Sequence, residues 1–107
     1  MKKQAIYRQG DVIMIAVKSM PNDTTPIARE SGRIILAHGE LTGHAHAIAD
    51  EQAEFFATKA GQQFLRITGA TAELRHEEHT AVKLPAGVYR VARQVEYSPQ
   101  ALRNVAD

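Results

Sequence analysis

Gly10-Asp-Val-Ile-Met-Ile-Ala-Val17 is the stretch that decides the fold class of this chain. Val12 to Val17 form an unbroken apolar run in which four of the six residues are β-branched. β-Branched side chains favour extended backbone, and a run of this length suits a buried strand better than a helix. We therefore expect a β-strand that begins directly after Gly10-Asp11.

Similar short segments follow along the chain, separated by turn-forming residues. Strands are predicted at residues 33–37, 44–48, 54–57, 63–68, 72–75, 81–84 and 88–97, whereas residues 20–26 form a turn-rich loop. In the last strand the alternation of polar and apolar residues slips near Ala92-Arg93, which indicates a β-bulge. Many short strands with closely spaced turns predict a mainly β fold, a small antiparallel barrel or sandwich.

The C-terminal segment departs from the strand pattern. Ser98 suits a helix N-cap and Pro99 suits the first helical turn, so a short C-terminal helix is predicted at residues 99–105. No linker, repeat or low-complexity tract interrupts the 107 residues, and a chain of this length supports one hydrophobic core. We expect a single β domain spanning residues 1–107.

The composition narrows the function classes. The charged residues nearly balance, with a formal net charge of +1, which disfavours a strongly basic nucleic-acid binder but leaves a local contact open. The absence of cysteine excludes disulfides, thiolate zinc fingers and a thiol nucleophile. With no hydrophobic signal core and no membrane-length apolar run, a cytoplasmic protein without a membrane partner is expected. Exposed sheet edges in so small a domain also predict a homo-oligomer.

All five histidines fall between residues 38 and 79. Imidazole is the commonest protein ligand for transition metals and also titrates near neutrality. Residues two apart in a strand share a face, so His44 and His46 can converge on one ion. Glu51 follows closely enough to return as a carboxylate ligand. The expected cofactor is a divalent ion (Zn, Fe, Mn or Ni), while His38 is expected beside the site or at the surface.

The second histidine group is Arg75-His-Glu-Glu-His-Thr80. Since strands are predicted on both sides, the segment is expected to form a hairpin turn from which His76 or His79 joins the first group. Glu77 and Glu78 are candidates for general acid and base, or else are simply solvated. The spacing does not fit the His-Glu-X-X-His signature of metalloproteases, which needs histidines four residues apart on a helix.

Two windows resemble the cupin family. Gly39-Glu-Leu-Thr-Gly-His-Ala-His-Ala-Ile-Ala-Asp-Glu51 is similar to its first metal motif, and Pro85-Ala-Gly87 to the Pro-X-Gly of its second. The resemblance implies a cupin-like barrel with His44, His46 and Glu51 as metal ligands. The chain departs from the family at Arg90, where a cupin has its last histidine, and in a first motif one residue shorter. Tyr7-Arg-Gln-Gly-Asp11 and Leu84-Pro-Ala-Gly-Val-Tyr89 also resemble small bacterial proteins of unassigned function.

Two classes of function follow from these residues. The first is a metal-binding protein or metal-dependent enzyme whose ion polarises a small-molecule substrate or activates water or dioxygen. The second is a non-enzymatic module that contacts a protein, peptide or nucleic acid, or a structural component of a phage or other assembly. In the second class the histidines would be contact or pH-sensing groups, or would hydrogen-bond to Glu40 or Thr42 and fix a loop.

Overall fold

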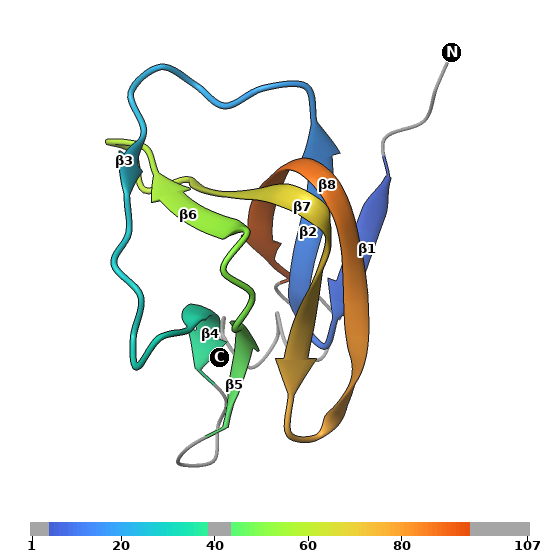
Figure 1. Cartoon of the computed structure of the whole chain (residues 1–107). Coiled ribbons are helices and arrows are strands. Elements are labelled where there is room, and N and C mark those ends of the chain that lie inside the picture. Colours follow the sequence, from blue (N-terminus) through green and yellow to red (C-terminus); the bar gives the residue numbers. More distant parts are fainter. Residues whose placement is uncertain (1–4, 39–43, 95–107) are drawn as a thin grey trace, which may run out of the picture.

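The computed structural model describes residues 5–38 and 44–94, and every helix or strand assigned within these ranges is a β-strand. The prediction of a mainly β, antiparallel fold is confirmed (Figure 1). The C-terminal helix predicted at residues 99–105 lies outside the described residues. Within them, no helix is long and apolar enough to cross a membrane. The strands are β1 (Ile6–Gln9), β2 (Val12–Val17), β3 (Thr25–Pro26), β4 (Ile34–His38), β5 (Ala45–Ile48), β6 (Ala53–Ala57), β7 (Gln63–His76) and β8 (His79–Arg93).

One antiparallel sheet contains all of these strands. Its main order is β1-β2-β8-β7-β5-β4, while β6 pairs with β7 and β3 pairs with β6. β6 pairs with the first half of β7 and β5 with its last residues, so β5 and β6 occupy successive parts of one edge. The long β7–β8 hairpin bends (Figure 1), and the sheet curls into a half-barrel. Over the described ranges it is therefore neither a closed barrel nor a two-sheet sandwich.

The two longest strands each join segments predicted to be separate. Residues 63–68 and 72–75 both belong to β7, and the pairing with β8 shifts between Ile67 and Thr71. Gly69 lies in this irregular part, where an added Cβ would meet the Gln52 side chain at 2.8 Å. The chain thus bends through a bulge instead of turning back. The bulge predicted near Ala92-Arg93 is wrong, because β8 pairs with β2 in continuous register as far as Arg93.

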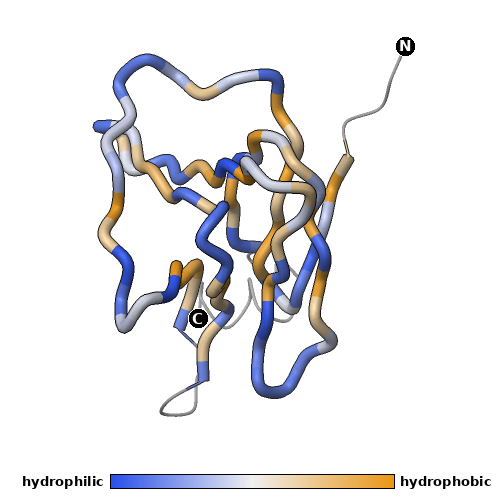
Figure 2. Tube along the Cα trace, in the orientation of Figure 1, coloured by the Kyte–Doolittle hydropathy of each residue, from blue (hydrophilic) through white to orange (hydrophobic). Residues whose placement is uncertain are grey.

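The core follows the alternation of side chains along each strand. In β2, Val12 and Met14 are fully buried, whereas the other four residues remain partly exposed. By contrast, all four residues of β5 are buried, including His46. The tip of the β7–β8 hairpin is hydrophilic, unlike the strands leading into it (Figure 2). The buried core cluster consists of Val12, Met14, Ile34, Leu36, Ala37, Ile48, Ala53, Phe55, Leu65, Ile67, Ala72, Leu74, Leu84, Tyr89 and Val91.

Candidate metal centre

Three histidines from separate strands form one group. His46 lies in β5, His76 ends β7 and His79 begins β8. One ring nitrogen of each lies within 4.8 Å of the corresponding nitrogens of the other two. The ring centroids of His46 and His76 are 4.3 Å apart, and those of His76 and His79 are 4.7 Å apart. Such a group can hold a metal ion.

Strand pairing explains why these rings meet. Ala47 pairs with Arg75, which places β5 beside the last residues of β7. His76 and His79 pair across the two-residue turn that joins β7 to β8, so the predicted hairpin is confirmed. The register shifts between Leu74 and His76, just before the ring that approaches His46. In Figure 1 the β7–β8 turn, β5 and the β1–β2 turn all lie towards the lower end of the molecule.

Gln9 fixes the orientation of the His46 ring. This side chain is 2% exposed, and its Nε2 donates hydrogen bonds to the carbonyls of Leu74 and Thr80, both at 2.9 Å. These two bonds orient the amide so that Oε1 faces His46 Nδ1 at 2.9 Å. An amide oxygen only accepts, so Nδ1 carries the proton of the neutral ring and Nε2 keeps its lone pair. Histidines that bind metals usually donate their second N–H to such a partner.

The β1–β2 turn brings the backbone against the same rings. Gly10 has φ of 60°, and a Cβ placed on it would lie 3.0 Å from His79 Nε2 and 3.1 Å from His46 Cε1. Next in the turn, Asp11 holds Oδ1 3.8 Å from His46 Nε2. Its other oxygen, Oδ2, accepts hydrogen bonds from Arg93 Nε at 3.0 Å and from an Arg93 terminal nitrogen at 2.7 Å. The turn therefore borders the histidine group closely.

The electrostatics favour a neutral His46. Burial lowers the pKa of its imidazole, and the nearby His76 ring lowers it further. The Arg93 hydrogen bond is the main cause of a lowered pKa at Asp11, which stays ionised. An unprotonated imidazole and an ionised carboxylate are the forms in which both groups bind cations.

The turn carboxylates make local contacts. Glu77 Oε1 accepts a hydrogen bond from the Ala45 N–H at 3.0 Å, which ties the turn to β5 and lowers the pKa of Glu77. The Glu78 N–H donates to His76 Nδ1 at 3.0 Å, and Glu78 Oε1 lies 3.4 Å from His44 Nδ1. Both glutamates are exposed. Their predicted roles as general acid and base stay predictions, while the tie from Glu77 to β5 is a positioning contact.

The remaining predicted ligands lie around the group but not in it. The His44 ring stands perpendicular to that of His76, with centroids 5.9 Å apart, and its buried Nδ1 makes no hydrogen bond. Glu51 is exposed in the turn between β5 and β6. His38 is exposed, with its Nε2 3.5 Å from Glu30. Of the five residues proposed as ligands from sequence, the structure brings His46, His76 and His79 together.

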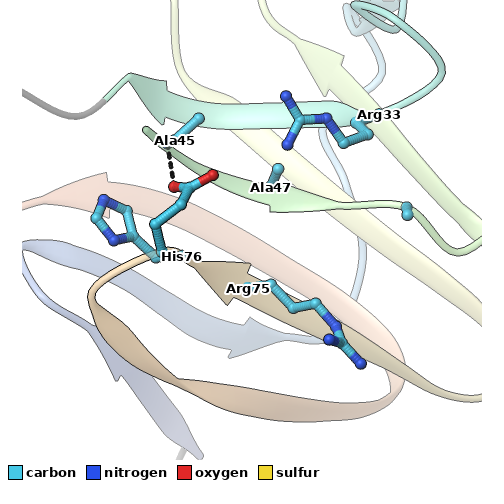
Figure 3. A pocket seen from close by; sticks show the side chains of 7 residues that line it. Arg33, Ala45, Ala47, Arg75 and His76 are labelled. Atoms are coloured by element: carbon cyan, nitrogen blue, oxygen red, sulfur yellow. Dashed lines mark hydrogen bonds between the residues drawn. The ribbon is translucent and has the colours of Figure 1, made fainter. Parts of the chain in front are cut away.

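A pocket of about 300 Å³ lies on the other side of β5 (Figure 3). Ala45 and Ala47 line it, and they alternate with His46, so this pocket and the histidine group occupy opposite faces of the strand. In Figure 3 the Arg33 side chain lies along β4, on the side of Ala47. His76 is the one member of the histidine group that lines the pocket. The pocket therefore adjoins the histidine site, but it is not the cleft in which the three rings meet.

Fold and site together define a small antiparallel β-domain with a three-histidine group at one end of a curled sheet. The family described as "Domain of unknown function (DUF8820)" matches residues 8–94, and the chain belongs to this family. No curated protein and no solved structure matched the chain. The resemblance to cupins therefore finds no support in these comparisons.

Sequence reasoning missed Gln9, Gly10 and Asp11 as parts of the site. They precede the first apolar run, far from every histidine in the sequence. The available signal was a polar Gln-Gly-Asp cluster between two strand segments. A glutamine at the last position of a strand is exposed more often than buried. Only the pairing of β1 and β2 with the rest of the sheet reveals that this one contacts His46.

Proposed function

We propose that His46, His76 and His79 bind one divalent transition-metal ion, with Zn, Fe, Mn and Ni as candidates. The observation that carries the proposal is the approach of their ring nitrogens, within 4.8 Å of one another, from separate strands. Metal–nitrogen bonds of about 2.0–2.1 Å in a tetrahedral site place neighbouring nitrogens about 3.4 Å apart. Closing the group requires ring movements that shorten the longest nitrogen–nitrogen separation by up to about 1.4 Å. His76 must also release the hydrogen bond that its Nδ1 accepts from the Glu78 N–H, because a neutral ring with an accepting Nδ1 carries its proton on Nε2. His79 is exposed, and its side chain makes no hydrogen bond among the residues that the structure describes, so the ring has room to rotate.

The exposure of the site favours chemistry over a purely structural ion. Structural zinc sites are closed by four protein ligands, whereas catalytic sites keep an open position for water or substrate. His46 is buried, His76 is half-buried and His79 is exposed, so one side of the group faces solvent. A divalent ion held there would supply Lewis-acid polarisation of a bound oxygen. Gln9 would meanwhile keep the His46 lone pair directed into the site. The proposal is a metal-dependent activity on a small molecule.

The test is metal binding by the purified full chain. After chelator treatment, Zn²⁺ and Co²⁺ are titrated by calorimetry, and bound metal is counted by elemental analysis. We expect one ion per chain, lost in His46→Ala, His76→Ala and His79→Ala. His38→Ala is the matched control, because this exposed histidine lies outside the group. Full metal content in the three variants would exclude these histidines as ligands.

One observation supports the alternative of an assembly module. Ile6 lies on β1, an end strand of the main sheet order, and is 63% exposed. Among the described residues, β1 pairs with β2 alone. Unpaired edges of this kind are where a second copy of a chain adds to a sheet. Light scattering of the wild type and of Ile6→Lys tests this alternative, which predicts an oligomer that the charged side chain disrupts.

A further inference from the structure

We propose that Asp11 is a fourth protein ligand of the ion beside the three imidazoles, and that the solvent-facing side of the ion remains open to substrate as a fifth ligand. This inference rests on the proposed function and specifies the coordination of that same site. Asp11 comes from the β1–β2 turn, whereas the three histidines come from β5 and the β7–β8 hairpin. The turn would therefore be an integral part of the metal centre.

The contact between Asp11 and His46 calls for a cation. The hydrogen bond to Gln9 places the proton of the neutral His46 ring on Nδ1, so Nε2 presents a lone pair. The atom facing it, at 3.8 Å, is Asp11 Oδ1, which is also an acceptor. An unprotonated Nε2 and a carboxylate oxygen at this distance repel each other unless a proton or a metal ion lies between them. A metal ion that both atoms bind would turn this repulsion into attraction.

The geometry of Asp11 is close to that of a bound ligand. Neighbouring donor atoms in a tetrahedral site lie about 3.4 Å apart, and the observed 3.8 Å between Oδ1 and Nε2 is slightly longer. Arg93 holds Oδ2 through two N–H groups, which leaves Oδ1 to point at His46. Carboxylates that bind metals are commonly held in this way by a hydrogen-bond donor on the other oxygen.

The turn and the hairpin can close around an ion. Asp11 does not belong to the group whose nitrogens all lie within 4.8 Å, so a movement must bring it nearer to the other two rings. His79 is the exposed member and packs against Gly10, the residue that precedes Asp11. A rotation of His79 towards the β1–β2 turn would bring its ring nitrogen nearer to Asp11 Oδ1. A carboxylate in the set would favour Zn²⁺, Mn²⁺ or Fe²⁺ over softer Cu⁺.

The experiment compares Asp11→Asn and Asp11→Ala with the wild type in the full chain. Zn²⁺ affinity is measured by competition with a chromophoric chelator, and the ligand field by the visible absorption of bound Co²⁺. Asp23→Asn is the control, since this exposed carboxylate accepts only a backbone hydrogen bond from Lys59. We expect Asp11→Ala to weaken Zn²⁺ binding by more than about 100-fold, the upper end of what loss of an outer hydrogen-bond partner costs. The Co²⁺ spectrum should change in both Asp11 variants.

The possible results separate the two proposals. A wild type that binds no Zn²⁺ overturns both the metal site and the role of Asp11. If the wild type binds Zn²⁺ but Asp11→Asn leaves the Co²⁺ spectrum unchanged, only the proposal that Asp11 is a ligand is overturned. This conclusion holds whatever affinity the variant loses. Circular dichroism and urea denaturation of each variant check that the fold is retained. Because Asp11 and Arg93 are both substantially exposed, we expect their separation to leave the fold intact.

Discussion

Replacing Gln9 by leucine should damage both the fold and the metal site. Leucine has a similar size but removes three hydrogen bonds, to Leu74 O, Thr80 O and His46 Nδ1. Each buried polar group left without a partner costs about 1–3 kcal/mol. A carbonyl in a sheet can also accept a hydrogen bond from a neighbouring strand. The unpaired Nδ1–H of His46 should therefore account for most of the lost stability. We expect Gln9→Leu to lower the free energy of unfolding by about 3–5 kcal/mol.

The same substitution should change the ring that binds the ion. Without Gln9 Oε1, nothing keeps the His46 proton on Nδ1, and losing such a partner typically lowers metal affinity about 10- to 100-fold. Urea denaturation measures the stability, nitrogen-15 NMR of the imidazole reports the tautomer, and chelator competition gives the Zn²⁺ affinity. Gln9→Glu retains an acceptor for His46, so its tautomer should stay as in the wild type even though two donated bonds are lost.

Gln62→Leu provides the control, because Gln62 is exposed and its side chain has no role in the site. Neither its stability nor its Zn²⁺ affinity should change measurably. If Gln9→Leu keeps the wild-type His46 tautomer and the wild-type affinity, the reasoning from the hydrogen-bond network is refuted. A variant that is less stable but binds Zn²⁺ normally would leave Gln9 a purely structural role.

Three further outcomes follow from the structure. The metal-free protein should lose stability as the pH falls below about 6.5, because the unfolded chain protonates before His46, whose pKa is lowered in the fold; urea denaturation at several pH values, with His46→Gln for comparison, measures this slope. Gly10→Ala should lower both the stability and the Zn²⁺ affinity more than Gly32→Ala does. Both glycines have positive φ, but only at Gly10 would an added Cβ press against His79. Equal effects of the two substitutions would contradict this contact. Leu65→Ala should cost about 2–5 kcal/mol of stability in thermal or urea unfolding, because the side chain is fully buried.

The fold class was accessible from local patterns, whereas the sheet topology was not. The β-branched run at Val12 to Val17 predicts β2 correctly, because side-chain alternation and propensity act within a strand. Nothing local predicts that β7 continues through Gly69 as one long strand. A glycine between two strand-like segments is compatible with either a turn or a bulge. Packing against Gln52 decides between them, and Gln52 is distant in the sequence.

The candidate site was predicted in part. Clustering of histidines pointed to His46, His76 and His79, which the structure brings together. The pairing of His44 with His46 assumed that both lie within one strand. In the structure β5 begins at Ala45, so His44 precedes the strand and the two-residue repeat does not govern its direction. Motif spacing also predicted Glu51 as a metal ligand. Spacing cannot predict where the chain leads after the strand ends, and the structure places Glu51 in an exposed turn.

The position of the histidine group coincides with one of the two shortest strand pairings among the described residues. β5 pairs with β7 only through Ala47 with Arg75 and Ile48 with Leu74. Beyond these residues the ladder ends, and the Glu77 hydrogen bond to Ala45 and the rings of His46 and His76 make the contacts between β5 and the hairpin. An ion at this point would link β5, the β7–β8 hairpin and, through Asp11, the β1–β2 turn. Binding to the folded state alone would stabilise it by about 2.7 kcal/mol at a free ion concentration one hundred times the dissociation constant. In the proposed site, metal binding and the attachment of β5 are therefore coupled by the same side chains.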